Sequence, residues 1–376
     1  MYISQNFDAG NIEVVSCSDP SDIQLNIRSD NASEFYQWFY YRLSGVKGRA
    51  CTMHILNAGG AAYPPGFENY RVCYSYDRQN WLRHPTTLND SRLTIEFRSD
   101  YDSVYFAYFA PYSMERHADL IARSQLSPLC SHQIVGKTLD GQDIDLLKIS
   151  SNASEGPKRN CWIIARQHPG ESMAEWWMEG CIERLIDEGD SASKKLLSQC
   201  DVYLVPNMNP DGSRRGHLRT NAAGRNLNRE WEEPEIEASP EVYFVKRLMD
   251  EVGVDFMLDV HGDESLPYCF IAGTEGLIDW DIRKQEQLDF YRNKLAVLNP
   301  DFQTEKGYPA KSPGTANLTM STVQTAQNHG CLAMTLEMPF KDTTATSDAT
   351  YGWSGERSKK LAHSCLDALS SYLQRL

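Results

Sequence analysis

The sequence of 376 residues lacks several features that would assign it to common protein classes. It has no stretch of about 18 apolar residues, so no membrane-spanning helix is expected. Its start lacks the basic and apolar segments of a signal peptide. Its ten cysteines are spread singly, without a CxxC pair. This usage is typical of reduced, mostly buried thiols, and we expect a cytoplasmic protein.

A long run of Lys and Arg is also absent. The chain has 37 Lys and Arg against 51 Asp and Glu, which gives a formal net charge of −14. Nucleic acids and anionic membranes both attract concentrated positive charge. We therefore expect neither a nucleic acid nor a membrane as a partner. The number of subunits is not indicated by the sequence.

The texture of the sequence predicts two domains. Residues 1–110 contain short segments with the alternating pattern of half-buried strands, separated by turn-rich stretches. This pattern predicts an antiparallel β-sandwich. Its clearest strands are expected at residues 22–28, 71–76, 92–98 and 104–109.

Residues 111–376 have a different texture, in which apolar runs alternate with helical patterns. This alternation predicts an α/β fold with helices on both faces of a sheet. Ser239 and Pro240 are typical of the start of a helix, and an amphipathic helix closes the chain. Buried strands are expected at residues 161–165, 201–206, 255–260 and 331–336.

The first candidate site residues are His168 and Glu171, in the segment His-Pro-Gly-Glu after a predicted buried strand. Ligand sites gather at the carboxyl ends of such strands, and Pro-Gly permits a bend that turns both side chains to one point. An imidazole and a carboxylate are ordinary zinc donors, and a catalytic zinc needs three. His261, just after the third predicted strand, is the candidate third ligand. A structural reading, in which Glu171 caps a helix and His168 is buried in the core, stays open.

Three further segments carry candidate chemistry. Asn207–Gly212 has the composition of a tight turn. Residues 214–229 hold several arginines in an acidic protein, which indicates either an anion site or a solvated basic loop. Glu337 ends an apolar strand, where desolvation would raise its pKa toward that of a general base, although a carboxylate reaching solvent is the simpler interpretation.

These motifs, in this order, resemble the M14 zinc carboxypeptidases, and the preceding β domain resembles the cytosolic carboxypeptidase subfamily. The resemblance implies a mixed-sheet α/β/α catalytic domain and one Zn²⁺ per chain, held by His168, Glu171 and His261. This is the His₂Glu ligand set of carboxypeptidase A. The implied substrate is a peptide or protein C-terminus, with acidic residues such as glutamate suggested by the subfamily.

The resemblance also implies roles for residues around the metal. Glu337 would act as general base toward the zinc-bound water, and Arg219 would stabilise the oxyanion. Asn228 and Arg229 would bind the terminal carboxylate, although Arg225-Asn226 offers a rival register.

The sequence departs from the family pattern at two positions. Asn226 stands where an Asp often supports a metal-bound His, so the support is weaker or comes from another carboxylate. The position of the substrate-capping Tyr is Thr315, with Tyr308 the nearest alternative. Residues 306–330, which include Lys306, Lys311 and His329, should shape the specificity pocket without a clear signature.

Two other functions stay open at this point. One is a zinc deacylase or amidase acting on N-acyl amino acids. The other is a non-catalytic peptide-binding module that retains the scaffold.

Overall fold

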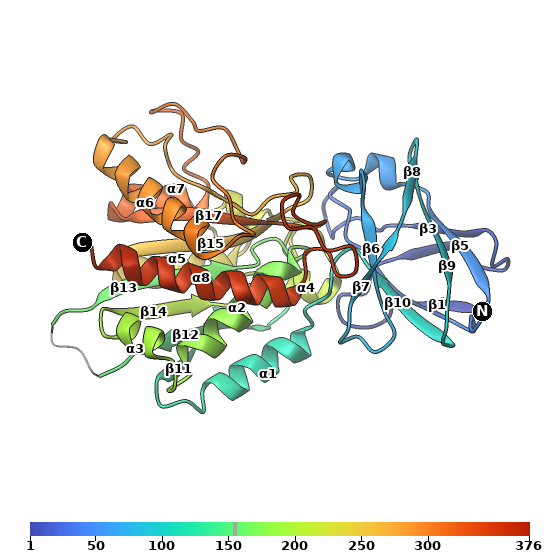
Figure 1. Cartoon of the computed structure of the whole chain (residues 1–376), viewed down its shortest axis with the longest axis horizontal. Coiled ribbons are helices and arrows are strands. Elements are labelled where there is room, and N and C mark those ends of the chain that lie inside the picture. Colours follow the sequence, from blue (N-terminus) through green and yellow to red (C-terminus); the bar gives the residue numbers. More distant parts are fainter. Residues whose placement is uncertain (153–155) are drawn as a thin grey trace.

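The computed structural model describes residues 1–152 and 156–376. Two bodies lie end to end along the longest axis of the molecule (Figure 1). The first is built from strands and two short 3-10 helices, and the second combines a large sheet with helices. The carboxyl ends of the central strands of the large sheet point toward the first body (Figure 1).

Two five-stranded sheets form the N-terminal body, in the orders β1-β4-β10-β6-β7 and β2-β3-β5-β9-β8. Most neighbours pair antiparallel, and β3 pairs with β5 in parallel. Buried and less buried residues alternate along β9 of the second sheet and along most of β10 of the first, so each sheet turns one face inward, and the predicted β-sandwich is confirmed. The elements are β1 (Tyr2–Ser4), β2 (Glu13–Ser16), β3 (Ile23–Asn26), β4 (Tyr40–Ser44), β5 (Ala50–Ile55), η1 (Ala58–Gly60), η2 (Pro64–Phe67), β6 (Arg71–Ser75), β7 (Leu82–Pro85), β8 (Thr87–Asn89), β9 (Arg92–Arg98) and β10 (Ser103–Ala107).

A seven-stranded mixed sheet, ordered β11-β12-β14-β13-β15-β17-β16, forms the centre of the second body. The four middle strands are parallel, and antiparallel strands flank them on both sides. The strands are β11 (Cys130–Lys137), β12 (Asp143–Ile149), β13 (Arg159–Ala165), β14 (Cys200–Val205), β15 (Phe256–Asp263), β16 (Phe270–Ala272) and β17 (Leu332–Pro339). The middle strands are almost wholly buried because helices cover both faces, as the sequence predicts.

The helices divide between the two faces of this sheet. Those around α8 pack in one apolar cluster, and α5 and α7 pack in a second cluster on the other face. The helices are α1 (Met114–Ser124), α2 (Ser172–Leu185), α3 (Ser191–Leu197), α4 (Pro210–Arg215), η3 (Leu227–Arg229), α5 (Pro240–Val252), α6 (Ile282–Leu298), α7 (Ser321–His329) and α8 (Gly355–Leu373). Ser239 and Pro240 do begin α5, but the Ser239 hydroxyl contacts the carbonyl of Glu235 instead of capping the helix.

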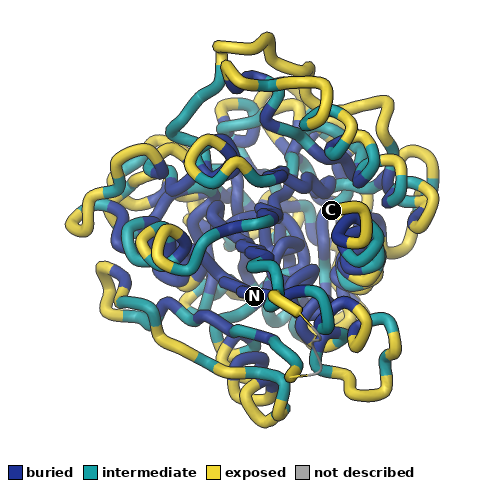
Figure 2. The backbone as a smooth tube through the Cα atoms, turned by 90° about the vertical axis from the view of Figure 1, so that its left-hand side faces the viewer, coloured by how far each residue is buried: buried dark blue, intermediate teal, exposed yellow. Residues whose placement is uncertain are grey.

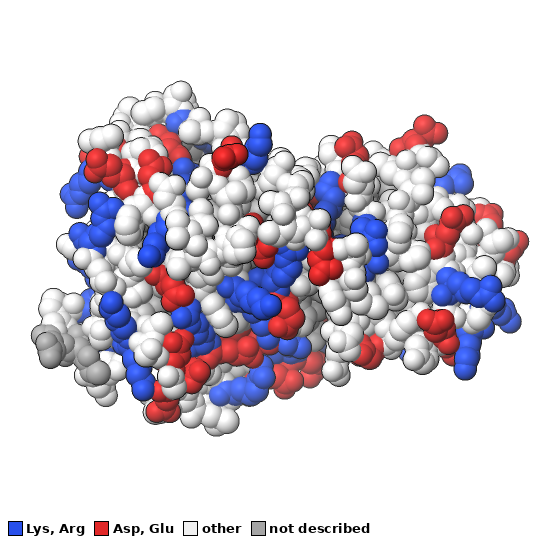
Figure 3. All heavy atoms as spheres, in the orientation of Figure 1, with Lys and Arg blue, Asp and Glu red and all other residues white. Residues whose placement is uncertain are grey.

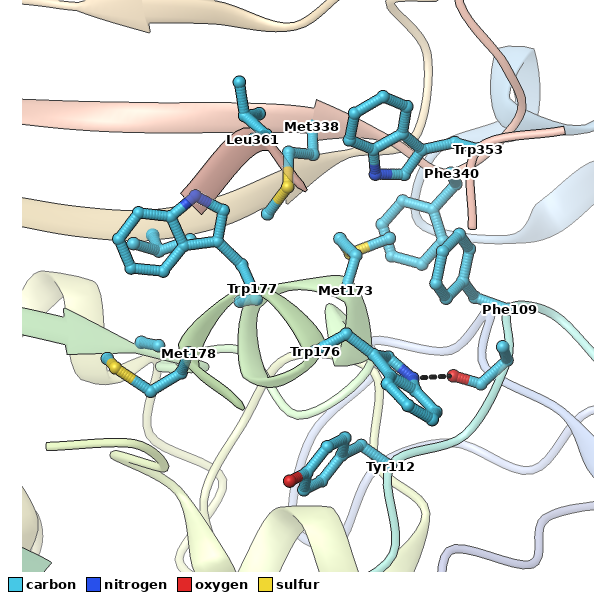
Figure 4. Packing of buried hydrophobic residues seen from close by; sticks show 14 of the residues in the cluster. Phe109, Tyr112, Met173, Trp176, Trp177, Met178, Met338, Phe340, Trp353 and Leu361 are labelled. Atoms are coloured by element: carbon cyan, nitrogen blue, oxygen red, sulfur yellow. Dashed lines mark hydrogen bonds between the residues drawn. The ribbon is translucent and has the colours of Figure 1, made fainter. Parts of the chain in front are cut away.

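The apolar core is continuous between the two bodies. Phe109, at the end of the sandwich domain, and Tyr112, just after it, pack with Trp176 of α2 and with Phe340 and Trp353 near the end of the chain (Figure 4). The indole of Trp176 also donates a hydrogen bond of 3.1 Å to the carbonyl of Ala110. Buried segments run through the centre of the molecule and exposed ones lie at its periphery (Figure 2). The two bodies are therefore held in a fixed arrangement by shared core packing.

Three properties expected from the sequence concern the whole molecule. Among the described residues, which include all ten cysteines, every thiol is free, and seven of the ten are buried. Within the same residues, a helix with the length and apolar character needed to cross a bilayer is not found. Basic and acidic side chains are interspersed on the face shown in Figure 3, in agreement with the absence of a basic run in the sequence.

Candidate active site

The side chains of His168, Glu171 and His261 converge at one buried point. One donor atom from each lies within 4.8 Å of the others. Glu171 Oε1 lies 2.6 Å from His168 Nδ1, Glu171 Oε2 lies 2.8 Å from His261 Nδ1, and the two Nδ1 atoms are 3.2 Å apart. Tetrahedral zinc, with bonds of about 2.0–2.3 Å, separates neighbouring ligand atoms by about 3.3 Å. The donor set fits a zinc ion, and the two nitrogens already lie at about this separation, with the carboxylate closer to them at hydrogen-bond distance.

The turn that aims His168 begins directly after β13. Arg166 has a positive φ of 57°, which is uncommon for a residue other than glycine. Its guanidinium closes the turn by donating to the carbonyl of Pro169 at 3.0 Å. Gly170 lies where a Cβ would come within 2.9 Å of the carbonyl oxygen of Leu218, so the close approach requires glycine there. The bend expected of the Pro-Gly pair is thus present.

The helix-cap interpretation of Glu171 is not what the structure has. Glu171 stands at the N-cap position of α2, but among the described residues its side chain accepts no hydrogen bond from the backbone N–H groups of the first helical turn. Instead its carboxylate contacts both imidazoles and accepts from the backbone N–H of Gly262 at 3.1 Å. The carboxylate therefore points at the two histidines and not at the start of the helix.

The outer nitrogens of both histidines have partners that fix the ring orientation. His168 Nε2 hydrogen-bonds to Asn226 Oδ1 at 3.0 Å, so Asn226 takes the supporting position that the sequence suggested. His261 Nε2 lies 2.9 Å from Asp259 Oδ2. With a metal at Nδ1, such contacts would hold the proton on Nε2 and orient the ring.

Asp259 belongs to the site although the sequence analysis does not name it as a candidate. The available signal was its spacing, because residues two apart on a strand share one face, and Asp259 and His261 are both on β15. Its carboxylate also accepts from the amide of Gln167 at 2.6 Å and from the hydroxyl of Ser321. This network holds Asp259 behind the histidine.

The protonation of His168 suits a metal ligand. Burial lowers its pKa to about 4, and the positive charge of Arg219 acts in the same direction. The imidazole is therefore neutral at physiological pH. A neutral imidazole is the form that binds zinc.

Glu337 lies beside the three metal-site residues. It is paired in register with His261 on the adjacent parallel strand. Its Oε2 atom is buried and has no hydrogen-bond partner among the described residues, and Oε1 accepts from Tyr308 at 3.3 Å. Burial raises the pKa of Glu337 well above its ordinary range; the charge of His261 opposes this shift, and that of Glu171 adds to it. The interpretation of Glu337 as a solvent-exposed strand end does not fit, since the residue is only 6% exposed.

One cavity of about 690 Å³ joins these residues to the candidate substrate-binding groups. Arg219, Asn228 and Arg229 line it together with the metal-site residues. Within the described residues, neither Arg219 nor Arg229 forms an ion pair with a carboxylate. Arg225, the rival position, is instead half exposed and paired with Glu230 at 3.0 Å. The arginine-rich segment thus places two uncompensated guanidinium groups in the cavity.

Part of the segment 306–330 lines one side of the cavity, with Lys306, Lys311 and Tyr308 among the lining residues. The Tyr308 hydroxyl donates to Asp263 Oδ2 at 2.6 Å, so this ring belongs to the site. Thr315 instead bonds to the carbonyl of Ser312, and His329 pairs with Asp250. Tyr308, and not Thr315, therefore supplies the hydroxyl beside Glu337.

The segment Asn207–Gly212 is structural, in agreement with the tight-turn interpretation. Asn209 caps α4 by accepting from the N–H of Gly212 at 3.0 Å and donates to the carbonyl of Gln167 at 3.0 Å. Asn207 donates to Glu175 at 3.0 Å. These bonds anchor the end of β14 to the turn that carries His168.

Family models match both parts of the chain. Residues 3–109 match the cytosolic carboxypeptidase N-terminal domain, and residues 115–293 match zinc carboxypeptidase. Cytosolic carboxypeptidase 6 of Caenorhabditis elegans is 26% identical over 90% of this chain and 79% of its own length.

Two solved structures have the same fold throughout. A metallo-carboxypeptidase from Burkholderia cenocepacia is 46% identical, with a TM-score of 0.97 over 100% of this chain and 99% of that one. A metallo-carboxypeptidase from Pseudomonas aeruginosa, in complex with (2-guanidinoethylmercapto)succinic acid, is 43% identical with a TM-score of 0.97 over the same shares. The chain therefore belongs to the M14 zinc carboxypeptidases, a family of peptide hydrolases, and carries the N-terminal domain of the cytosolic carboxypeptidases.

Proposed function

We propose that this metallocarboxypeptidase removes single residues from peptide or protein C-termini by zinc-dependent hydrolysis. The observation that carries the proposal is that one cavity holds a His₂Glu donor set, a buried carboxylate with an unpartnered oxygen, and two guanidiniums without carboxylate partners among the described residues. These are the groups that hydrolysis of a terminal peptide bond requires. The roles proposed below follow from their chemistry.

His168, Glu171 and His261 would hold one zinc ion per chain. Zinc bound there would supply Lewis-acid activation of the scissile carbonyl and of water. The supports on Nε2 of each histidine keep Nδ1 as the donor atom. Three protein ligands leave a fourth position open, as catalytic zinc sites do.

Glu337 would move the protons. Its unpartnered Oε2 accepts a proton from the attacking water, whose oxygen forms the new bond to the carbonyl carbon. Oε2 of Glu337 then delivers that proton to the amine nitrogen as the C–N bond breaks. The raised pKa suits this exchange, because a carboxylate with an ordinary pKa holds a proton too weakly for efficient transfer.

Arg219 would bind the scissile carbonyl oxygen. A guanidinium donates hydrogen bonds in a fixed plane, and its charge stabilises the negative oxygen of the tetrahedral state. Removing one such donor costs about 100- to 1000-fold in rate in comparable sites. No carboxylate among the described residues competes for this group.

Asn228 and Arg229 would bind the terminal carboxylate. The Oδ1 atom of Asn228 is occupied by the N–H of Ser321 at 2.9 Å, which leaves the amide N–H₂ group as a donor for the substrate. Burial and the charge of Arg219 lower the pKa of Arg229, so a bound carboxylate would relieve the repulsion between two cations. A clamp on the chain end explains why one residue is removed and internal bonds are spared.

A preference for C-terminal glutamate is part of the proposal. Lys306 and Lys311 line the cavity wall formed by residues 306–330, and neither forms an ion pair within the described residues. The Pseudomonas relative is described with a molecule that carries both a succinic acid and a guanidinoethyl group, so this ligand does not distinguish an acidic from a basic terminal side chain. The preference for an acidic side chain at the substrate terminus therefore rests on the two lysines.

Two further expectations accompany this function. We place the domain boundary between residues 110 and 111, since the last sandwich strand ends at Ala107 and α1 begins at Met114. We also place the protein in the cytoplasm, in keeping with its free thiols and with the names of its cytosolic relatives.

The test combines metal analysis with digestion of C-terminal peptides by the wild type and by Glu337→Gln. We expect about one zinc per chain in both proteins, release of the last residue by the wild type, and at least a 100-fold lower kcat in the variant. Glu183→Gln, an exposed helix position, is the matched control. Full activity of Glu337→Gln would remove this residue from its role, and hydrolysis of N-acyl amino acids in preference to peptides would favour a deacylase.

A further inference from the structure

The sandwich domain holds the segment that carries Arg219. We call residues 214–224 the Arg219 loop. The N–H of Ala9 donates to the carbonyl of Arg214 at 3.0 Å, and the Asn11 amide donates to the carbonyl of Gly216 at 2.8 Å. Further along, the Asn31 amide donates to the carbonyl of Ala222 at 2.9 Å. The loop is thus bound along its length by backbone and side chains from the other domain.

Asp30 makes the central contact between the two. Its carboxylate accepts from three successive backbone N–H groups, those of Leu218 at 2.6 Å, Arg219 at 2.8 Å and Thr220 at 2.9 Å. It also accepts from the Thr220 hydroxyl at 3.1 Å. Asp30 is only 3% exposed, so these bonds lie in a region of low dielectric, where bonds to a charged acceptor are strong.

The sandwich also supplies two aromatic rings, those of Phe35 and Tyr63, on which the guanidinium of Arg219 packs; we call these rings the shelf. The Arg219 Cζ atom lies 5.6 Å from the ring centre of Phe35 and 5.5 Å from that of Tyr63. The N–H of Asp30 donates to the carbonyl of Phe35 at 2.8 Å, so one turn presents both the carboxylate and the ring. Gln37 fixes Tyr63 by bonds to its N–H and its carbonyl. Cation–π contacts of this kind hold the plane of a guanidinium.

The contact extends to the metal-site turn. The carbonyl of Leu218 accepts from the N–H of Gly170 at 2.8 Å, while the N–H of Leu218 donates to Asp30. Gly170 lies between His168 and Glu171. This bond between Gly170 and Leu218 links the Arg219 loop to the turn that holds two metal-site residues.

We propose that Asp30 is a positioning residue for catalysis, which acts through the backbone of residues 218–220 to aim the guanidinium of Arg219, and that the sandwich domain thereby completes the active site. The inference rests on the proposed role of Arg219. It gives the sandwich a function that its sequence does not reveal. Truncation of the first domain would then remove the contacts that position Arg219.

The test replaces Asp30 by Asn, which keeps the size of the side chain but cannot accept all four hydrogen bonds. We expect kcat for a C-terminal peptide to fall about 10- to 100-fold, the scale on which misplacement by about 1 Å acts, while KM changes less than threefold. Asp90→Asn, at an exposed turn of the same domain, is the control. Phe35→Leu, at a partly exposed position, removes one ring of the shelf and should lower kcat in the same direction.

A double-mutant cycle separates positioning from general damage. If Asp30 acts through Arg219, Asp30→Asn should reduce kcat less than threefold when Arg219 is already Ala. Equal reductions in both backgrounds would overturn the proposal, as would full kcat in Asp30→Asn with zinc bound. If Asp30→Asn does not fold, unfolding curves will show it, and Phe35→Leu in the same cycle then decides the question.

The cycle also distinguishes failure of this inference from failure of the proposed function. Arg219→Ala with unchanged kcat would contradict the role of the arginine itself, whatever Asp30 does. Arg219→Ala with a large loss, beside Asp30→Asn without one, would leave the proposed function intact and remove only the positioning role.

Discussion

The Nδ1 atoms of His168 and His261 lie 3.2 Å apart, although 93 residues separate them in the sequence. The sheet accounts for this proximity, because β13 and β15 are adjacent parallel strands with Ala165 beside Val260. The next strand, β17, brings Glu337 into register with His261. The carboxyl ends of neighbouring strands therefore assemble the site, as is general for parallel sheets.

The partner of His168 should tune metal affinity. Asn226→Asp places a carboxylate beside Nε2, makes the imidazole a better donor and should raise zinc affinity, on the order of tenfold. Asn226→Leu removes the acceptor and should lower the affinity about 10- to 100-fold. Competition with a chelator measures both, with Asn89→Asp on the exposed β8 as control. Equal affinities in all variants would exclude Asn226 as the support.

The two possible carboxylate clamps can be told apart by substitution. Arg229→Ala should raise KM for peptides about 10- to 100-fold, since a hydrogen bond to a charged group is worth about 1.5–3 kcal/mol. Arg225→Ala should change KM less than twofold, because this side chain is exposed and paired with Glu230. Steady-state kinetics on one peptide decides the matter. The reverse result would favour the earlier register.

Gly216 should be intolerant of a side chain. Its φ is 73°, and a Cβ there would lie 2.7 Å from the carbonyl oxygen of Ala9. Gly48 has a similar φ of 71° but open space around it. Gly48→Ala should therefore cost only the backbone term of about 1–2 kcal/mol. Gly216→Ala should lower the free energy of unfolding by at least about 1 kcal/mol more, which denaturant titration measures. Equal losses would contradict the close packing of the Arg219 loop on the sandwich.

His117 should make stability depend on pH. Burial alone would lower its pKa, but the charge of Glu175 and hydrogen bonds with Asp145 and Glu175 raise the pKa from 6.5 to about 9. A folded pKa above the unfolded one gives stability that is fully present below pH 6.5 and is lost as the pH rises through 9.

Denaturant unfolding at pH 6 and pH 10 measures this contribution. The difference between wild type and His117→Gln should shrink by up to about 3 kcal/mol over that interval. His84→Gln, in the sandwich, is the control. A constant difference would show that His117 does not carry the effect.

The sequence predicts the features that local patterns encode. The strand ends bearing His168, His261 and Glu337 could be recognised because each follows a buried apolar run. The elements that escaped prediction lack a clean pattern. In α6 the buried Leu288 coexists with Ile282 and Val297, which are 75% and 84% exposed, so the apolar residues do not mark one face. The edge strand β11 likewise shows no simple alternation.

Contacts between domains could not be predicted at all. The carboxylate of Asp30 accepts its shortest hydrogen bond from the N–H of Leu218, 188 residues later in the chain, and nothing near Asp30 in the sequence points to this contact. The bond exists because the two bodies dock through shared core packing. Tyr308 is a similar case, because its hydroxyl reaches Asp263 only once the loop after α6 folds over the cavity.

In the proposed reaction, a free C-terminal carboxylate, held by Asn228 and Arg229, directs hydrolysis to the last peptide bond. Two peptides identical except for a free acid or an amide at the C-terminus test it, with products read by mass spectrometry over time. We expect stepwise loss of single residues from the free acid and at least a 100-fold slower reaction with the amide. Equal rates on both peptides, or internal fragments from either, would contradict it.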